Sequence, residues 1–159
     1  MATAEPQRRR SDSRRPQSQP FGPTPGALGP PDPEAVTRSL ELALESAHRT
    51  RRPITLVSLE LPPPGDEPAL TQVASLVRRT VRDTDGLWRD GATTLILLLT
   101  DADGPNSEPA LARLRLRLRS EGLGAVLMGR AAPAPGISAT DLLDLARDDR
   151  RSISYGTRG

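Results

Sequence analysis

Apolar positions along the chain recur with two different spacings. A spacing of three to four residues, as in Leu40, Leu44 and Ala47, predicts an amphipathic helix. Strict alternation, or a short unbroken apolar run such as residues 95–99, predicts a strand. The pattern predicts four helices. The first runs from residue 32 or 33 to 50, the second from 68 or 69 to 82, the third over 107–122 and the last from 138 or 140 to 147. It predicts strands over residues 54–61, 86–89, 95–99 and 123–131.

Proline and glycine separate these segments. Residues 62–65 read Pro-Pro-Pro-Gly and end a strand sharply, and Asp90-Gly91 favours a hairpin turn because both residues tolerate a positive φ. The resulting order is βαββαβ with flanking helices. It predicts an α/β fold, a sandwich of the ferredoxin-like or palm type, in which helices flank a central and mostly antiparallel sheet.

Residues 114–119 fit both spacings. The alternation Leu-Arg-Leu-Arg-Leu-Arg is typical of a strand, whereas Leu111, Leu114 and Leu118 lie at helical spacing and leave Leu116 off the stripe. We predict a helix here, because Ser107 can cap its start and Gly122 ends it. The next strand also requires a crossover connection.

Residues 1–33 differ in composition from the rest. They hold 8 of the 17 prolines and almost no large apolar residue, so we predict a disordered tail. The tail has five arginines and three acids, and it therefore carries all of the formal net charge of +2. Two interpretations stay open: a solvated extension, or an arm for anionic partners, among which nucleic acid would bind only weakly. Residues 34–150 are predicted to form one domain, and residues 151–159 a frayed C-terminus.

The composition excludes several classes of protein. The chain has no cysteine, which excludes disulfides and thiolate metal sites. No long apolar run is present, so we predict no membrane span, and no apolar segment follows the N-terminal charges as it does in a signal peptide. These features predict a cytoplasmic location.

One hairpin resembles a known family. Residues 82–85 read Arg-x-x-Asp, a short strand follows, and then residues 91–95 read Gly-Ala-Thr-Thr-Leu. This order resembles the hairpin of the GGDEF family, the diguanylate cyclases, in which Arg-x-x-Asp precedes Gly-Gly-Asp/Glu-Glu-Phe at the same spacing. Segments similar to the family's preceding helix, late strand and last helix extend the resemblance over roughly residues 34–150, namely residues 70–77, 125–131 and 138–146.

The resemblance implies the family's fold without its activity. Family members make cyclic di-GMP from two GTP molecules, and acids hold two divalent metals on the triphosphate. Glu60 keeps one such acid. Pro62 and the neutral hydroxyls of Thr93 and Thr94 stand where the family has the other metal-binding acids. Residues 62–67 stand where the family has its guanine-binding segment. We therefore expect no cyclase activity, catalytic residue, metal or cofactor. The degenerate positions are Glu60, Pro62, Gly91, Ala92, Thr93 and Thr94.

The Arg-x-x-Asp pattern is retained at Arg82 and Asp85. In many family members it is an inhibitory site for cyclic di-GMP, and the resemblance places a further ligand-binding arginine at about Arg113. An arginine can bond guanine O6 and N7, and an aspartate can accept from its N1–H and amino group. Alternatively, Arg82 and Asp85 form an ordinary pair three residues apart at a helix end.

Two functions follow from these alternatives, and a third class, an active enzyme of another kind, stays open. The first is a catalytically inactive, GGDEF-like regulatory protein that binds cyclic di-GMP through Arg82, Asp85 and Arg113. The second is a protein-interaction scaffold with no nucleotide ligand. The sequence indicates a protein partner in either case but does not name it.

Overall fold

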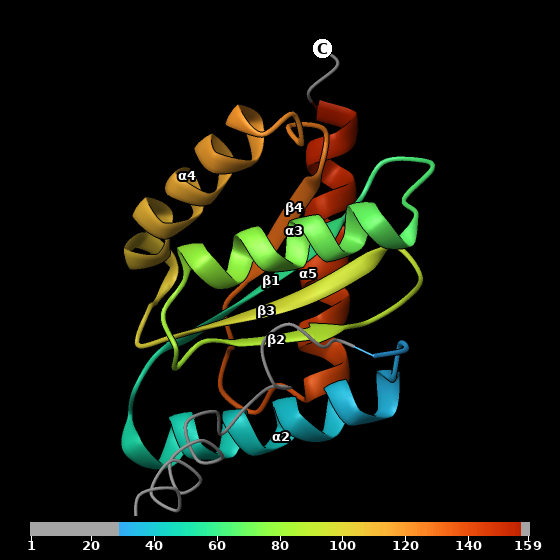
Figure 1. Ribbon diagram of the computed structural model, residues 1–159. Helices are drawn as coiled ribbons and strands as arrows, with labels where there is room; N and C mark the ends of the chain where they lie inside the picture. The colour runs from blue at the N-terminus through green and yellow to red at the C-terminus, as the bar shows by residue number, and fades with distance from the viewer. Residues whose placement is uncertain (1–28, 157–159) are drawn as a thin grey trace, which may run out of the picture.

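The computed structural model describes residues 29–156, so most of the predicted tail 1–33 and residues 157–159 lie outside the described part. Within it, no helix is long and apolar enough to cross a membrane. The elements follow in the order α2 (Pro33–Thr50), β1 (Ile54–Glu60), α3 (Glu67–Thr80), β2 (Gly86–Arg89), β3 (Thr94–Thr100), α4 (Gly104–Ser120), β4 (Leu127–Ala131) and α5 (Ala139–Gly156) (Figure 1).

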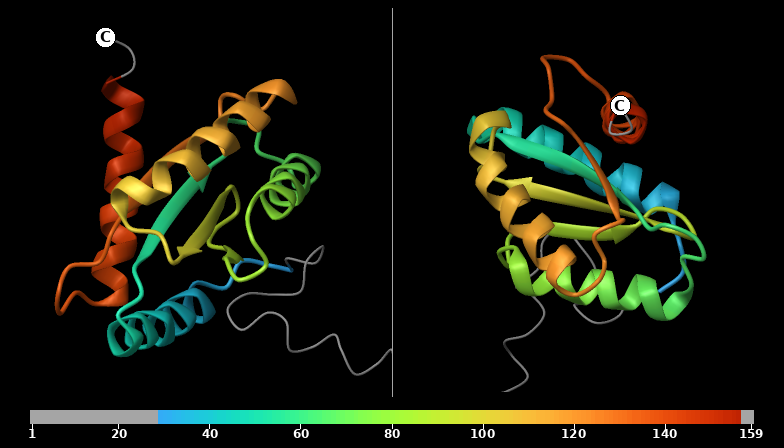
Figure 2. Two further views of the ribbon diagram at one scale, coloured as in Figure 1. Left: turned by 90° about the vertical axis from the view of Figure 1, so that its left-hand side faces the viewer. Right: turned by 90° about the horizontal axis from the view of Figure 1, so that it is seen from above.

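The strands form one four-stranded sheet in the order β2-β3-β1-β4, and every neighbouring pair is antiparallel. The longest ladder joins β1 to β3, from Ile54 opposite Thr100 to Glu60 opposite Thr94. Helices α3 and α4 cover one face of the sheet, and α2 and α5 cover the other (Figure 2). The predicted α/β sandwich, with its central antiparallel sheet, is therefore confirmed.

Alternate residues of each strand supply two separate cores. In β1, Leu59 packs in the core under α3 and α4, whereas Leu56 packs in the core under α2 and α5. In β3, the odd-numbered residues of 95–99 belong to the first core, and Ile96 and Leu98 belong to the second. The unbroken apolar run in β3 thus reflects burial on both faces, as predicted.

The ambiguous segment 114–119 is helical, as predicted, and belongs to α4. Leu111, Leu114 and Leu118 are buried, whereas the side chain that left the helical stripe, Leu116, is 61% exposed. The helical periodicity therefore outweighs the strand-like alternation, because it is the one that buries a continuous stripe.

The predicted start of α4 at Ser107 is wrong. Helix α4 begins at Gly104 with Asp103 as its N-cap, and the Asp103 carboxylate accepts a hydrogen bond from the Asn106 N–H at 3.0 Å. A carboxylate at this place satisfies a free N–H of the first turn and lies at the positive end of the helix dipole. Ser107 is instead buried inside the helix.

Further boundaries differ from the prediction. Helix α3 ends at Thr80 rather than at residue 82, so Arg82 and Asp85 lie in the turn after the helix. Strand β4 covers only Leu127–Ala131 rather than 123–131, because Leu123 N–H closes the end of α4 by bonding to Leu118 and residues 123–126 form a turn. Helix α5 continues to Gly156, beyond the predicted end at Arg147. The added turns place Arg150 against the sheet, where its side chain is buried.

Candidate functional site

The end of β1 lies directly beside the β2–β3 hairpin. Glu60 is opposite Thr94 in the ladder, and the Leu61 N–H donates to the Thr93 carbonyl at 3.0 Å. Pro62 follows at once. The structure therefore brings together four of the degenerate positions that the sequence singled out.

The Glu60 carboxylate is paired with an arginine that the sequence analysis missed. Arg150 Nη2 lies 3.1 Å from Glu60 Oε1, and Arg150 Nη1 donates to the Ser58 hydroxyl. The Arg150 side chain is only 8% exposed. Burial lowers the pKa of its guanidinium, although the neighbouring Glu60 charge acts in the opposite direction. The sequence did contain a signal that Arg150 would be buried, because it lies at helical spacing from Leu142, Leu143 and Ala146, which are buried in the structure.

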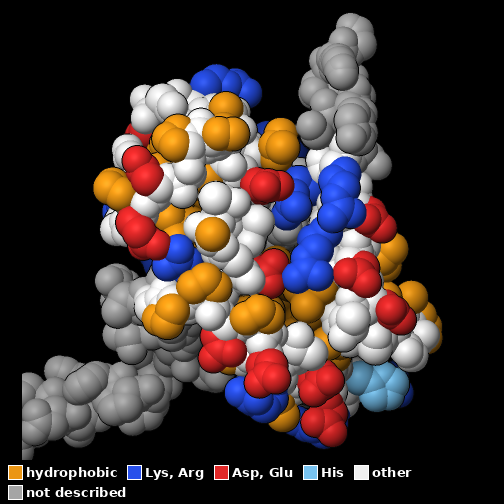
Figure 3. All heavy atoms as spheres, turned by 90° about the vertical axis from the view of Figure 1, so that its right-hand side faces the viewer, with side chains coloured by type: hydrophobic (Ala, Val, Ile, Leu, Met, Phe, Trp, Pro, Cys, Tyr) orange, Lys and Arg blue, Asp and Glu red, His pale blue; other side chains and the backbone are white. Residues whose placement is uncertain are grey.

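A second arginine of α5 holds the hairpin. Arg147 Nη2 lies 3.0 Å from both carboxylate oxygens of Asp90, whose side chain is 7% exposed, and Arg147 also contacts Asp144 at 3.3 Å. Figure 3 shows this face of the molecule, where basic side chains form a row with acidic side chains on either side. Two carboxylates near the hairpin are thus neutralised from one helix.

The turn after β1 fills the space next to the hairpin. Gly65 has a φ of +56° and lies so close to Thr93 that a Cβ at Gly65 would be 2.7 Å from Thr93 Cγ2. A side chain at this position would therefore be strained by the backbone conformation and would require Thr93 to shift. Residues 62–66 form a compact connection between β1 and α3 against the hairpin.

Arg89, the last residue of β2, contacts the tip of the hairpin. Its guanidinium pairs with Glu67 and donates to the carbonyls of Gly91 and Ala92, each at 3.3 Å. Among the residues that the structure describes, no group of three or more acids and histidines is placed to hold a metal ion. The hairpin thus offers carbonyls and hydroxyls, partly engaged by an arginine, where a metal–triphosphate site requires carboxylates.

Replacing Arg147 by alanine should lower the free energy of unfolding by about 1–2 kcal/mol, because the largely buried Asp90 carboxylate loses its partner. Chemical denaturation measures the change. Arg151→Ala is the matched control, since Arg151 pairs with Asp148 at an exposed site and should change stability by less than about 0.5 kcal/mol. Equal effects of the two substitutions would refute a tethering role for Arg147.

Asp85 is buried and fully engaged. Its side chain is 3% exposed, and its oxygens accept hydrogen bonds from the Arg82 N–H at 2.9 Å, the Thr100 N–H at 2.9 Å and the Thr100 hydroxyl at 3.0 Å. A carboxylate in this position ties the segment after α3 to the end of β3. Its acceptor capacity is largely used within the protein.

Arg82 contacts the same strand end but remains largely accessible. Its side chain is 61% exposed, its Nη2 donates to the Thr100 carbonyl, and its Nε is 4.0 Å from Asp85. Arg113 is exposed on α4 and, within residues 29–156, forms no hydrogen bond or ion pair with either residue. Arg78, which the sequence analysis missed, donates to the Asp85 carbonyl at 3.0 Å, and burial lowers the pKa of its guanidinium.

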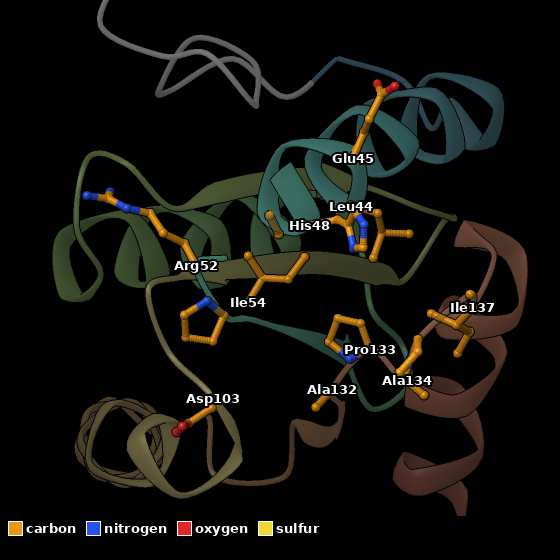
Figure 4. Close-up of a pocket in the computed structure, with 14 residues that line it drawn as sticks. Leu44, Glu45, His48, Arg52, Ile54, Asp103, Ala132, Pro133, Ala134 and Ile137 are labelled. Carbon is orange, nitrogen blue, oxygen red and sulfur yellow. The ribbon is translucent and has the colours of Figure 1, made fainter. Parts of the chain in front are cut away.

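A cavity of about 640 Å³ lies away from all of these residues. Side chains of α2, the start of β1 and residues 132–137 surround it, and most are apolar, such as Leu44, Ile54 and Pro133 (Figure 4). His48 and Arg52 supply polar groups at its wall. None of the site residues that the sequence predicted lines this cavity.

No family model and no curated protein matches the sequence. Solved structures do match the fold. The GGDEF domain of DgcB from Caulobacter crescentus, solved in complex with c-di-GMP, is 18% identical with a TM-score of 0.69, and the match covers 86% of this chain and 91% of that one. The active GGEEF domain of a diguanylate cyclase from Vibrio cholerae is 14% identical with a TM-score of 0.68, covering 82% and 93%.

A third similar structure contains a protein partner. The diguanylate cyclase SiaD from Pseudomonas aeruginosa, in complex with its activator SiaC, is 18% identical with a TM-score of 0.70, and the match covers 81% of this chain and 56% of SiaD. These likenesses show that the chain has the fold of GGDEF domains, which confirms the resemblance at the level of the fold.

Proposed function

We propose that this chain is a catalytically inactive regulatory protein that uses the GGDEF fold to bind another protein. The observation that supports this function best is the pairing of Glu60, the one acid retained at the family's metal-binding positions, with the buried Arg150. A carboxylate with a guanidinium at 3.1 Å has little net charge left for a divalent cation.

The surrounding charge adds to this argument. Catalysis of GTP condensation needs several carboxylates to hold two divalent metals on a triphosphate. Here the hairpin supplies Thr93 and Thr94, and α5 places two arginines, Arg147 and Arg150, against the nearest acids. Metal ions brought to this place would meet carboxylates that guanidinium groups already neutralise, so we infer that turnover is lost.

A receptor for cyclic di-GMP is the second candidate. The 61% exposed Arg82 side chain favours it, and DgcB was solved with c-di-GMP. The contacts of Asp85 count against it, because its carboxylate is engaged by Arg82 N–H and Thr100 and has little capacity left for guanine. SiaD, solved with its activator SiaC, exemplifies a chain of this fold that binds a protein. We therefore place protein binding first.

Titration of the full chain with cyclic di-GMP should give no saturable heat in a calorimeter, because binding would require Asp85 to release the end of β3. Arg82→Ala and Arg113→Ala should give the same flat trace. Saturable binding to the wild type that is lost in Arg82→Ala would instead make the chain a cyclic di-GMP receptor and remove the first proposal.

A further inference from the structure

The outer face of α4 carries a dense positive charge. Between Ala110 and Ser120 the helix contains four arginines and no acid. All four arginine side chains are exposed, and so is the leucine between them. These five residues, Arg113, Arg115, Leu116, Arg117 and Arg119, are called the α4 face below.

The arginines of the α4 face have no acidic partner among residues 29–156. Several other arginines in this part of the chain do form ion pairs, for example Arg52 with Asp101 and Arg130 with Glu108. None of the four arginines of α4 forms an ion pair or a side-chain hydrogen bond there. Their charge is therefore available to another molecule.

Helix geometry puts an apolar residue at the centre of this charge. Side chains turn by roughly 100° per residue, so Leu116 points opposite the buried stripe that contains Leu114 and Leu118. Two arginines lie on each flank of Leu116. At 61%, Leu116 is the most exposed large apolar side chain of the described residues. Figures 1 and 2 show α4 at the outside of the molecule.

We propose that the α4 face docks an acidic segment of a partner protein. An apolar side chain of the partner would cover Leu116, and carboxylates around it would pair with the flanking arginines. This inference deepens the proposed function, because it names the surface and the chemistry of the partner that the proposed function requires.

Charge and composition favour a protein over other anionic surfaces. A membrane-binding helix needs a broad apolar face, but the broad apolar face of α4 is buried in the core and only Leu116 remains outside. A surface for single-stranded nucleic acid usually combines basic side chains with aromatic side chains on which bases stack, and the α4 face has no aromatic residue. The basic tail of this chain has the wrong sign of charge to cover the face.

The test measures binding of a labelled synthetic helix by fluorescence anisotropy to the full chain. The helix carries leucines on one face, surrounded by glutamates. We expect saturable binding. The affinity should fall about tenfold in Leu116→Ser, and at low salt it should fall about tenfold or more in the double variant Arg115→Glu/Arg119→Glu. Both sites are exposed, and circular dichroism verifies that the variants fold.

Matched substitutions on α2 provide the controls. Leu42 is 60% exposed, close to the value for Leu116, and Arg49 is exposed as well. Leu42→Ser and Arg49→Glu should leave the affinity for the helix unchanged. Absence of binding, or equal weakening by the α2 and α4 substitutions, would overturn the docking proposal.

Competitors decide the class of partner. Duplex DNA and vesicles rich in phosphatidylglycerol are added to the preformed complex, and each should displace the helix less well than unlabelled helix does at equal negative charge. Stronger displacement by DNA or vesicles would contradict a protein partner. GTP turnover is measured on the same protein sample, so a failure of the proposed function is distinguished from a failure of the docking surface.

Discussion

Replacing Gly129 by alanine should lower the free energy of unfolding by about 3 kcal/mol, because the added methyl group would overpack the contact between β4 and α5. A Cβ at Gly129 would lie 2.2 Å from the Arg150 nitrogen and 2.4 Å from the Ala146 carbonyl oxygen. Both are backbone atoms of α5, so the whole helix would have to move away from β4. Urea denaturation followed by circular dichroism measures the loss.

The shift should also affect the neutralised acids. Arg147 and Arg150 extend from the same part of α5 to Asp90 and Glu60, so a displaced helix would lengthen both ion pairs. Gly124→Ala is the control, because the nearest atoms to its Cβ lie at 3.6 Å, an ordinary contact distance. It should change stability by less than about 0.5 kcal/mol. A Gly129→Ala protein as stable as Gly124→Ala would show that α5 does not pack as described.

Replacing Asp85 by alanine should cost about 2–3 kcal/mol. The substitution leaves the backbone N–H groups of Arg82 and Thr100, and the Thr100 hydroxyl, without their acceptor near the end of β3. Unsatisfied buried donors carry the full cost of their desolvation. Thermal or urea unfolding reports the loss in the absence of any ligand.

Asp83 supplies the comparison for Asp85. It lies two positions earlier in the same segment and is exposed, so Asp83→Ala should leave stability nearly unchanged. If Asp85→Ala were equally harmless but abolished binding of cyclic di-GMP, the aspartate would be a ligand-binding residue rather than a structural one.

The fold could be predicted because its apolar periodicities are local and consistent. The stripe of Leu111, Leu114 and Leu118 indicates a helix even though the letters alternate, and the exposure of Leu116 follows from that choice. The apolar run of β3 likewise indicates burial on both faces. Boundaries were less predictable, because the end of α5 depends on whether Arg150 finds partners on the sheet.

The candidate site could be predicted only in part. From the resemblance, the sequence predicts that acids are missing from the hairpin, because the hydroxyls of Thr93 and Thr94 are neutral whatever surrounds them. The pairing of Glu60 with Arg150 joins residues far apart in the chain, and it exists only once α5 crosses β4. Local spacing therefore predicts the loss of acids at the hairpin, but it does not predict the ion pair between Glu60 and Arg150.

Asp85 is a second residue whose contacts could not be predicted from local spacing. Its spacing from Arg82 suggests a ligand pair, because three residues along a helix would place both side chains on one side, but α3 ends at Thr80 and both residues lie in the turn after it. Its actual partners include Thr100, which follows a whole hairpin later. Only the tertiary structure distinguishes a carboxylate that is free to bind a ligand from one whose oxygens are hydrogen-bonded within the protein.

The most direct test of a non-catalytic function is incubation of the purified full chain with GTP and Mg²⁺, followed by chromatographic separation of the nucleotides. We predict unchanged GTP and no cyclic di-GMP above a blank without protein. Arg150→Ala should give the same result, because freeing Glu60 does not supply the acids that Thr93 and Thr94 lack. Cyclic di-GMP that accumulates in proportion to the protein concentration, and disappears in Glu60→Gln, would contradict the account.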